Sequence, residues 1–248
     1  MEWIEGRNPV RELLRAGRRR ALEVVLAEGI GGKDIDALEK RAASLGVRTS
    51  RAPRRVLDQR SDGAVHQGVM ARCEPYPYSS LEDLLDCARS RREDLFIVFA
   101  DHIEDPHNLG SLIRTAEEAG VHGVIIPNRR AAPVTPAVVK ASAGATEHMQ
   151  VARVTNLVRT AERLKVEHVW FFGADAGGVP VYDVNLSGPV ALCVGGEARG
   201  LSRLLAETCD EVVALPSRGR IGSLNASVAG AVLMYEVVRR RTVDLNSD

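Results

Sequence analysis

Apolar runs that alternate with amphipathic segments organise the second two-thirds of the chain. Continuous apolar runs bounded by polar residues are typical of strands buried on both faces, and they occur at 95–100, 123–127, 169–174, 190–195 and 211–215. Segments with a helical period lie among them at 109–119, 134–142, 202–207 and 223–241. Strands that alternate with helices predict an α/β fold with a mostly parallel sheet covered on both faces.

The first third has shorter elements. Its pattern predicts helices at 6–14, 33–45 and 54–59, and strands at 21–27, 47–51 and 68–72. The segment 74–80 (EPYPYSS) holds two prolines in three residues, which oppose both a helix and a central strand. We therefore expect a small α/β domain at 1–73, a linker at 74–80 and a larger domain at 81–248.

Charge is distributed unevenly although the net charge is zero. Residues 1–72 contain 15 Lys/Arg against 10 Asp/Glu, an excess of five, and the rest of the chain has the opposite excess. This asymmetry fits a polyanion-binding module on an acidic body, or equally a set of solvated helix faces. Aromatic residues are only 4%, which disfavours base reading by stacking. The candidate RNA contacts are Arg18, Arg19, Arg20, Arg54 and Arg55.

Cysteine spacing and hydropathy exclude several classes of protein. The four cysteines form no CxxC pair, so we expect no metal site. Residues 1–20 have no apolar signal core, and no stretch approaches the roughly 20 apolar residues of a membrane span. We expect a cytoplasmic protein with no membrane partner.

Three loops that follow predicted strands carry candidate chemistry, because ligands of such sheets bind beyond the carboxyl ends of the strands. The first, 101–114, contains Asn108, a possible helix N-cap, and Arg114, which could equally form a surface salt bridge. The second, 195–201 (GGEARGL), is rich in glycine, which permits a tight turn or close approach of a ligand. The third, 215–227, presents Ser223, Asn225 and Ser227 at a helix start, as caps or as ligand contacts.

The order of three motifs is more specific than any one of them. DPHNLGSLIRTAEEAG, CVGGEARGLS and LPSRGRIGSLNASVAGAVLMYEVVRRR resemble the motifs of the SpoU (TrmH-like) family in the SPOUT superfamily, over about residues 95–240. WIEGRNPVRELL and HQGV (66–69) resemble the substrate-binding domain of ribosomal-RNA members, a ribosomal-protein-like α/β RNA-binding fold. The nearest branch is the guanosine-2′-O-methyltransferases of 23S rRNA.

The resemblance implies methylation of a ribose 2′-hydroxyl in RNA with S-adenosylmethionine, most closely on a guanosine of large-subunit (23S) ribosomal RNA. Transfer RNA and an antibiotic-resistance site in ribosomal RNA remain alternatives. A trefoil knot in the C-terminal SPOUT domain and a homodimer through that domain are also implied. A non-catalytic RNA-binding protein is the rival of another class. A Rossmann-type oxidoreductase is disfavoured because the chain lacks GxGxxG near the first strand.

Site residues follow from the same resemblance. The implied catalytic residues are Asn108, Arg114, Glu197, Ser223 and Asn225. The implied cofactor contacts are Gly173, Ala174, Gly195, Gly196, Glu197, Leu215, Ser223, Leu224 and Asn225. The chain departs from the family pattern at Ser217, which replaces a methionine, and at Ala198, which replaces a glycine. Arg114 is implied to handle the hydroxyl proton; because arginine normally stays charged, it could instead hold a phosphate and stabilise an oxyanion.

Overall fold

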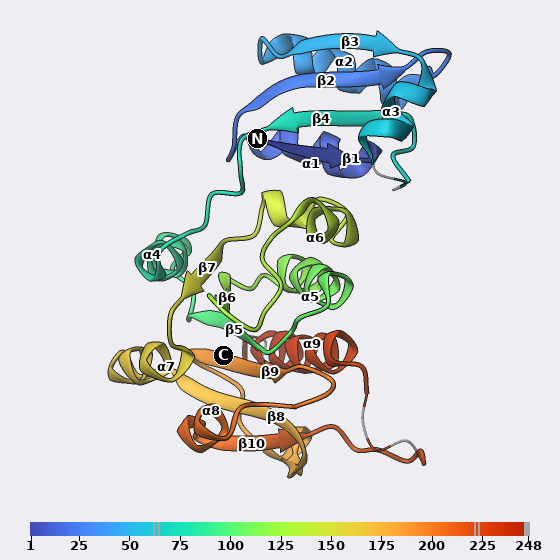
Figure 1. The fold of residues 1–248 in the computed structure, drawn as a ribbon. Helices are drawn as coiled ribbons and strands as arrows, with labels where there is room; N and C mark the ends of the chain where they lie inside the picture. Colours follow the sequence, from blue (N-terminus) through green and yellow to red (C-terminus); the bar gives the residue numbers. More distant parts are fainter. Residues whose placement is uncertain (62, 64, 221, 223, 246–248) are drawn as a thin grey trace. The chain divides into compact units, whose positions relative to one another are not determined.

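A computed structural model describes residues 1–61, 63, 65–220, 222 and 224–245 (Figure 1). The chain forms two compact units. The first comprises Met1–Pro77 together with Val134–His148, and the second comprises Tyr78–Pro133 and Met149–Asp248. A segment from the middle of the sequence therefore packs with the N-terminal residues. Among the described residues, none of the helices is both long enough and apolar enough to cross a membrane.

The first unit is a four-stranded sheet in the order β1-β4-β2-β3, in which only β2 and β3 are parallel. Its strands are β1 (Glu2–Glu5), β2 (Ala21–Ala27), β3 (Arg48–Ala52) and β4 (Val69–Cys73). Its helices are α1 (Arg7–Ala16), α2 (Lys33–Ser44), α3 (Arg54–Arg60) and α6 (Pro136–Ala141), followed by a 3-10 turn at Ala145–Glu147. The predicted elements of the first third are confirmed. β1 escaped prediction because four residues are too short to establish a period.

The HQGV segment fixes the start of α1 against β4. The buried His66 ring contacts Asp58 Oδ1 through Nε2 at 2.7 Å, and its Nδ1 accepts a hydrogen bond from the Gly68 N–H at 3.0 Å. Gln67 Oε1 accepts from the Arg7 N–H at 3.2 Å. The N-cap of α1 is Gly6, which has no side chain to offer, so Gln67 satisfies a helix donor that would otherwise need water. These residues therefore have a structural role in the first unit.

Arg19 anchors the segment 134–148 to the rest of the first unit. Its side chain is only 1% exposed, and its guanidinium donates to both carboxylate oxygens of Glu147, at 3.0 and 2.5 Å. A further nitrogen donates to Glu2 at 2.9 Å. These bonds with Glu147 raise the pKa of Arg19 although burial opposes the charge. Arg19 was predicted to contact RNA; the structure instead commits its guanidinium to the buried Glu147 and the half-buried Glu2, which converge on it.

The second unit is a six-stranded sheet in the order β10-β8-β9-β5-β6-β7, and every neighbouring pair in it is parallel. The strands are β5 (Phe96–Asp101), β6 (Gly123–Pro127), β7 (Val151–Val154), β8 (Trp170–Pro180), β9 (Val190–Gly195) and β10 (Glu211–Ala214). The helices are α4 (Leu81–Arg91), α5 (Pro106–Glu118), α7 (Leu157–Val166), α8 (Arg203–Thr208) and α9 (Ala226–Leu245), with a 3-10 turn at Val181–Asp183. The predicted α/β class and parallel sheet are confirmed; α4, β7 and α7 were not predicted.

Helices cover both faces of this sheet, as Figure 1 shows. On one face, apolar residues of α4, α7 and α8 form a single buried cluster with alternate residues of the strands. Phe99 and Phe171 meet there edge to face, with ring centroids 5.3 Å apart. On the other face α5 packs on α9. A Cβ atom at Gly230 would lie 2.5 Å from Leu112 Cδ1, so any larger residue there would require the Leu112 side chain to shift.

Candidate active site

The carboxyl ends of four neighbouring strands bring the three motif loops to one edge of the second sheet. Asp101 at the end of β5 pairs with Gly195 at the end of β9. Gly173 in β8 pairs with Cys193 in β9 and with Val212 in β10. Because all these strands are parallel, the segments that follow them leave the sheet on the same side. The register thus assembles residues that are about a hundred positions apart in sequence.

Asp105, not Asn108, caps helix α5. Its carboxylate accepts hydrogen bonds from the backbone N–H groups of His107 and Asn108, at 3.1 and 3.3 Å, and Pro106 occupies the first helical position. The predicted N-cap role of Asn108 is therefore wrong, because the helix begins one turn earlier than its apolar period indicated. Proline at the first position fits that start, since the missing N–H has no partner within the helix. The Asn108 side chain is left to face the neighbouring loops.

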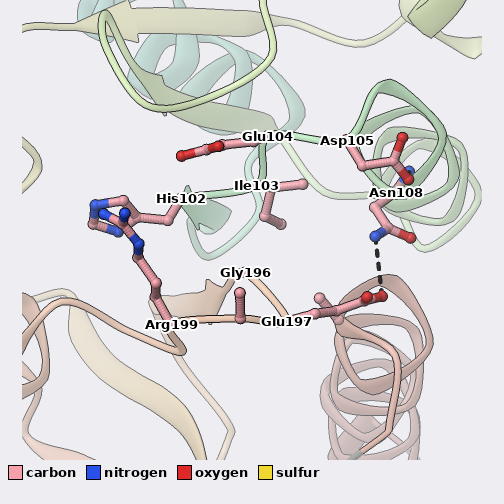
Figure 2. A pocket seen from close by; sticks show the side chains of 10 residues that line it. His102, Ile103, Glu104, Asp105, Asn108, Gly196, Glu197 and Arg199 are labelled. Atoms are coloured by element: carbon pink, nitrogen blue, oxygen red, sulfur yellow. Dashed lines mark hydrogen bonds between the residues drawn. The ribbon is translucent and has the colours of Figure 1, made fainter.

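A hydrogen-bonded polar cluster joins the three loops. Asn108 Nδ2 donates to Glu197 Oε1 at 3.0 Å (Figure 2). Asn225 Nδ2 donates to Asn108 Oδ1 at 2.9 Å and also contacts Glu197 Oε1. Asn225 Oδ1 accepts from the Ser227 N–H at 3.0 Å, so the same side chain caps α9. The structure therefore brings together Asn108, Glu197 and Asn225, while the candidate Ser223 lies outside the described residues.

Asp101 ties the glycine-rich loop to β5, a role that the sequence reasoning missed. Its buried carboxylate accepts from the Ser202 N–H at 2.7 Å, and its carbonyl accepts from the Gly196 N–H at 2.9 Å. A Cβ atom at Gly196 would lie 2.1 Å from the His102 carbonyl oxygen, and one at Gly195 would lie 2.1 Å from the Gly200 carbonyl carbon. These two glycines are required because backbone packs directly on backbone.

A hollow of about 180 Å³ opens between the first two loops. Figure 2 shows His102 and Arg199 at one end of it and Asn108 and Glu197 at the other. His102 has a φ of 56°, and its Nδ1 lies 2.9 Å from Asp101 Oδ1 without the alignment of a hydrogen bond. The sequence reasoning missed His102 and Arg199, whose signal is their position directly after strands. The hollow carries both signs of charge, which suits a polar ligand.

Arg114 stands apart from this hollow. It is exposed on α5, six residues beyond Asn108. Six residues of helix turn through about 600°, so the two side chains point roughly 120° apart. Arg114 is not among the residues that line the hollow, and no ion pair of its guanidinium is found among the described residues. The structure thus separates Arg114 from the other described polar candidates.

The predicted cofactor positions fall into buried and exposed groups. A Cβ atom at Gly173 would lie 3.0 Å from Leu201 Cδ1 and 3.1 Å from Cys209 Sγ, so this residue is packed under the second loop. Ala174 and Leu215 are half-buried, and Leu224 is 52% exposed. The Cys193 thiol donates a hydrogen bond to Cys209. This bond, together with burial, raises the pKa of Cys193, and the same bond lowers the pKa of Cys209 although burial opposes it.

Two family models match the chain in tandem. Residues 95–235, more than half of the chain, match the SpoU rRNA Methylase family. Residues 3–79 match a model described as RNA 2′-O ribose methyltransferase substrate binding. YacO of Bacillus subtilis, named as a TrmH-family tRNA/rRNA methyltransferase, is 43% identical over 242 residues, which cover 97% of this chain and 96% of that protein. A Staphylococcus aureus protein of the same description is 39% identical over 239 residues, which cover 96% of each.

Solved structures agree with these matches. The SpoU methyltransferase AviRb from Streptomyces viridochromogenes, solved with the cofactor AdoMet, has a TM-score of 0.80 at 25% identity and covers 97% of this chain and 90% of its own. An AdoMet-bound rRNA methyltransferase from Sinorhizobium meliloti has a TM-score of 0.78 at 25% identity, with 96% of this chain and 87% of its own covered. Together with the tandem match, these likenesses make the chain a member of the SpoU (TrmH-like) family of RNA methyltransferases.

Proposed function

We propose that the chain transfers a methyl group from S-adenosylmethionine to a ribose 2′-hydroxyl, on a guanosine of large-subunit ribosomal RNA. The polar cluster of Asn108, Glu197 and Asn225 carries the proposal, because one residue from each motif loop meets at the carboxyl ends of the strands. The match of residues 3–79 to a 2′-O ribose methyltransferase substrate-binding model supports the ribose as acceptor. The rRNA description of the family model supports the substrate class.

The residues present fit S-adenosylmethionine. The ligand combines a flat apolar base with a zwitterionic amino-acid end, and the site offers the exposed apolar Leu224, the half-buried Leu215 and the carboxylate of Glu197. Gly195 and Gly196 let the second loop pack closely on the chain around it, which sets the position of Glu197. These residues and Asn225 would hold the cofactor, with Gly173 and Ala174 in the neighbouring strand β8. When bound, the cofactor supplies a methyl group on a sulfonium, which is a good leaving group.

The protein's own task is to align the ribose oxygen and to manage its proton. A ribose hydroxyl is a poor acid near neutral pH, so the proton leaves as the new bond forms. Arg114 is exposed, and the planar fork of an arginine matches the geometry of a phosphate. It therefore binds the phosphate beside the reacting ribose and stabilises the oxygen as it becomes negative. Asn108 and Asn225 hold the loops that present the hydroxyl and the methyl group.

RNA binding falls to residues 1–73 in this proposal, with 74–80 as the linker and 81–248 as the catalytic domain, whose segment 134–148 packs in the first unit. Arg20, Arg54 and Arg55 are exposed and can contact phosphates. Arg18 is half-buried, and its guanidinium donates to the Tyr76 hydroxyl at 3.2 Å. The exposed arginines therefore carry the predicted electrostatic attraction.

The proposal includes a homodimer formed through the catalytic domain. Val228, Val232 and Tyr235 lie on one stripe of α9, at intervals of four and three residues, and are 47%, 39% and 48% exposed. A stripe of large apolar side chains at this spacing is typical of a helix that packs against a partner. V232D is expected to convert a dimer to a monomer by light scattering at micromolar concentration. If the wild-type protein is a monomer at that concentration, the proposed dimer is wrong. The knotted path of the loops stays part of the proposal.

The decisive experiment has two parts. Isothermal titration with S-adenosylmethionine is expected to show stoichiometric binding, and its absence would favour the non-catalytic RNA-binding protein. Mass-spectrometric mapping of 2′-O-methyl groups in RNA from a deletion strain is expected to show one guanosine of the large-subunit RNA without its methyl group. A loss confined to transfer RNA or to the small subunit would refute the substrate and retain the chemistry.

A further inference from the structure

A second hollow, of about 320 Å³, lies wholly within the first unit between α1 and α2. Arg11, Leu14 and Arg15 line it from one face of α1, at i, i+3 and i+4. The facing stripe of α2 follows the same spacing, with Asp34, Ala37, Leu38 and Arg41 at i, i+3, i+4 and i+7. Neighbours at these intervals share a helix face, so the two helices build the walls from sequence-encoded stripes.

The hollow has an apolar floor and a basic rim. Leu14 and Leu38 are 1% and 5% exposed and form the floor, and Ala37 is exposed and small enough to leave the space open. Arg11, Arg15 and Arg41 are all exposed, and Asp34 is the one acidic residue among those that line the hollow. At about 320 Å³ the volume lies at the lower end of the range of small-ligand pockets, roughly 300–1,000 Å³.

Contacts within the unit hold the arginines in place without using all their donors. Arg41 Nε donates to the Leu14 carbonyl oxygen at 3.0 Å, and its two terminal nitrogens have no hydrogen-bond partner among the described residues. Glu12 accepts from Arg11 Nε at 2.9 Å and lies 3.5 Å from Arg15 Nη1. His148, at the end of the segment 134–148, contacts the other Glu12 carboxylate oxygen at 2.9 Å. Although burial opposes it, these bonds lower the pKa of Glu12, which therefore stays a carboxylate that orients the rim.

We propose that this hollow receives an unpaired nucleotide of the RNA substrate, with its base over the leucine floor and its flanking phosphates on the three arginines. Unpaired bases are splayed from RNA and stack on apolar surfaces or on guanidinium planes, while arginine binds phosphate in bidentate fashion. The hollow offers both surfaces within one nucleotide's reach. It lies in the part of the chain that matches the RNA substrate-binding model. The inference rests on the proposed function, and it adds a specific subsite to it.

A substitution that fills the hollow without changing its charge tests whether a base binds there. Anisotropy would compare a fluorescein-labelled RNA hairpin that has a single-stranded loop with a fully paired RNA of equal length. A37W is expected to weaken hairpin binding about tenfold, which is about 1.4 kcal/mol, and to leave the duplex unaffected. A37S, which barely changes the volume, is the matched control. Wild-type hairpin affinity in A37W, or an equal loss for both RNAs, would overturn the proposal.

Substitutions that remove the arginine charges of the rim test whether phosphates bind to them. The triple variant R11Q/R15Q/R41Q is expected to reduce the slope of log affinity against log salt by about 1.4, at roughly 0.7 for each of the two flanking single-strand phosphates. R89Q/R203Q removes exposed charge from the second unit and should keep the wild-type slope. Because Arg41 also bonds to Leu14, R11Q/R15Q is measured too, with thermal unfolding of every variant as the folding check. A wild-type slope in folded R11Q/R15Q excludes the rim as a phosphate site.

Two further readouts separate this proposal from its rivals. Poly-glutamate is expected not to compete with the hairpin; competition that A37W abolishes would assign the hollow to an acidic protein partner and overturn the proposal. S-adenosylmethionine titration of A37W is expected to match the wild type. If wild-type protein fails to bind the cofactor yet A37W still loses the hairpin selectively, the proposed reaction fails while the subsite stands.

Discussion

The two units use charge in opposite ways. In the first unit, Arg19 and Glu147 are each 1% exposed and pair with each other. In the second unit, Arg114 and Glu197 are exposed at or near the loops that follow the strands. Breaking a buried ion pair leaves an uncompensated charge inside the fold and destabilises it, whereas an exposed charge remains available to a ligand. Residue type alone thus did not distinguish a structural arginine from a functional one. The burial of the arginine side chain makes this distinction.

Loss of the buried pair gives the largest expected effect on stability. R19A leaves Glu147 as a buried charge without its main partner, which costs about 3–5 kcal/mol of unfolding free energy. Urea unfolding followed by circular dichroism measures it. R20A removes the exposed neighbour and should change stability by less than about 0.5 kcal/mol. If R20A destabilised the protein as much as R19A, the contrast between buried and exposed arginines would fail.

The exposed arginine of the second unit is expected to show the converse behaviour. R114A should lower single-turnover methyl transfer by about 10²–10³-fold, the usual cost of removing one group that stabilises transition-state charge. Cofactor affinity should stay within twofold of the wild type, because Arg114 is separated from the loops that would hold the cofactor. R89A, an exposed arginine on α4, is the control. Wild-type turnover in R114A would remove it from the mechanism.

Deleting the N-terminal part of the first unit tests whether this unit binds the RNA while the second unit binds the cofactor. A chain of residues 78–248 loses Arg19, so Glu147→Gln should be included to avoid a bare buried carboxylate. We expect this chain to bind S-adenosylmethionine and to bind RNA at least about tenfold more weakly, with a smaller salt slope because fewer counterions are released. Binding isotherms across a salt series measure both quantities. Full-length affinity and slope would show that the basic excess of the first third is incidental.

A pH titration gives the smallest expected effect. His122 Nδ1 accepts from the buried Phe96 N–H at 2.9 Å, and burial lowers the pKa of His122 below its ordinary 6.5 despite the neighbouring Glu93. The folded state therefore resists protonation more than the unfolded state does. Stability is fully present above pH 6.5 and falls as the pH drops below it, by about 1.4 kcal/mol for each unit of pKa lowering. H122N should flatten this dependence relative to the wild type, and an unchanged slope would assign it to other groups.

Most of the secondary structure could be predicted from the sequence, because long apolar runs and helical periods are local signals. Short elements such as β1 and β7 were not, since four residues are too few to establish a period. The start of α5 was misplaced because its apolar period begins one turn after Asp105, the residue that caps it. The motif order alone was enough to identify the family, whereas the substrate is still a proposal.

By itself, then, the sequence determined the α/β class, the parallel sheet, the family and the polar residues at its motif loops. Only the tertiary structure decided which of them meet. Strand register brings Asn108 to Glu197 and Asn225, while helical rotation turns Arg114 away from them. Packing of the segment 134–148 buries Arg19 against Glu147. The physical reason is that periodicity encodes which face of an element is apolar, whereas burial and pairing depend on long-range contacts that no local pattern specifies.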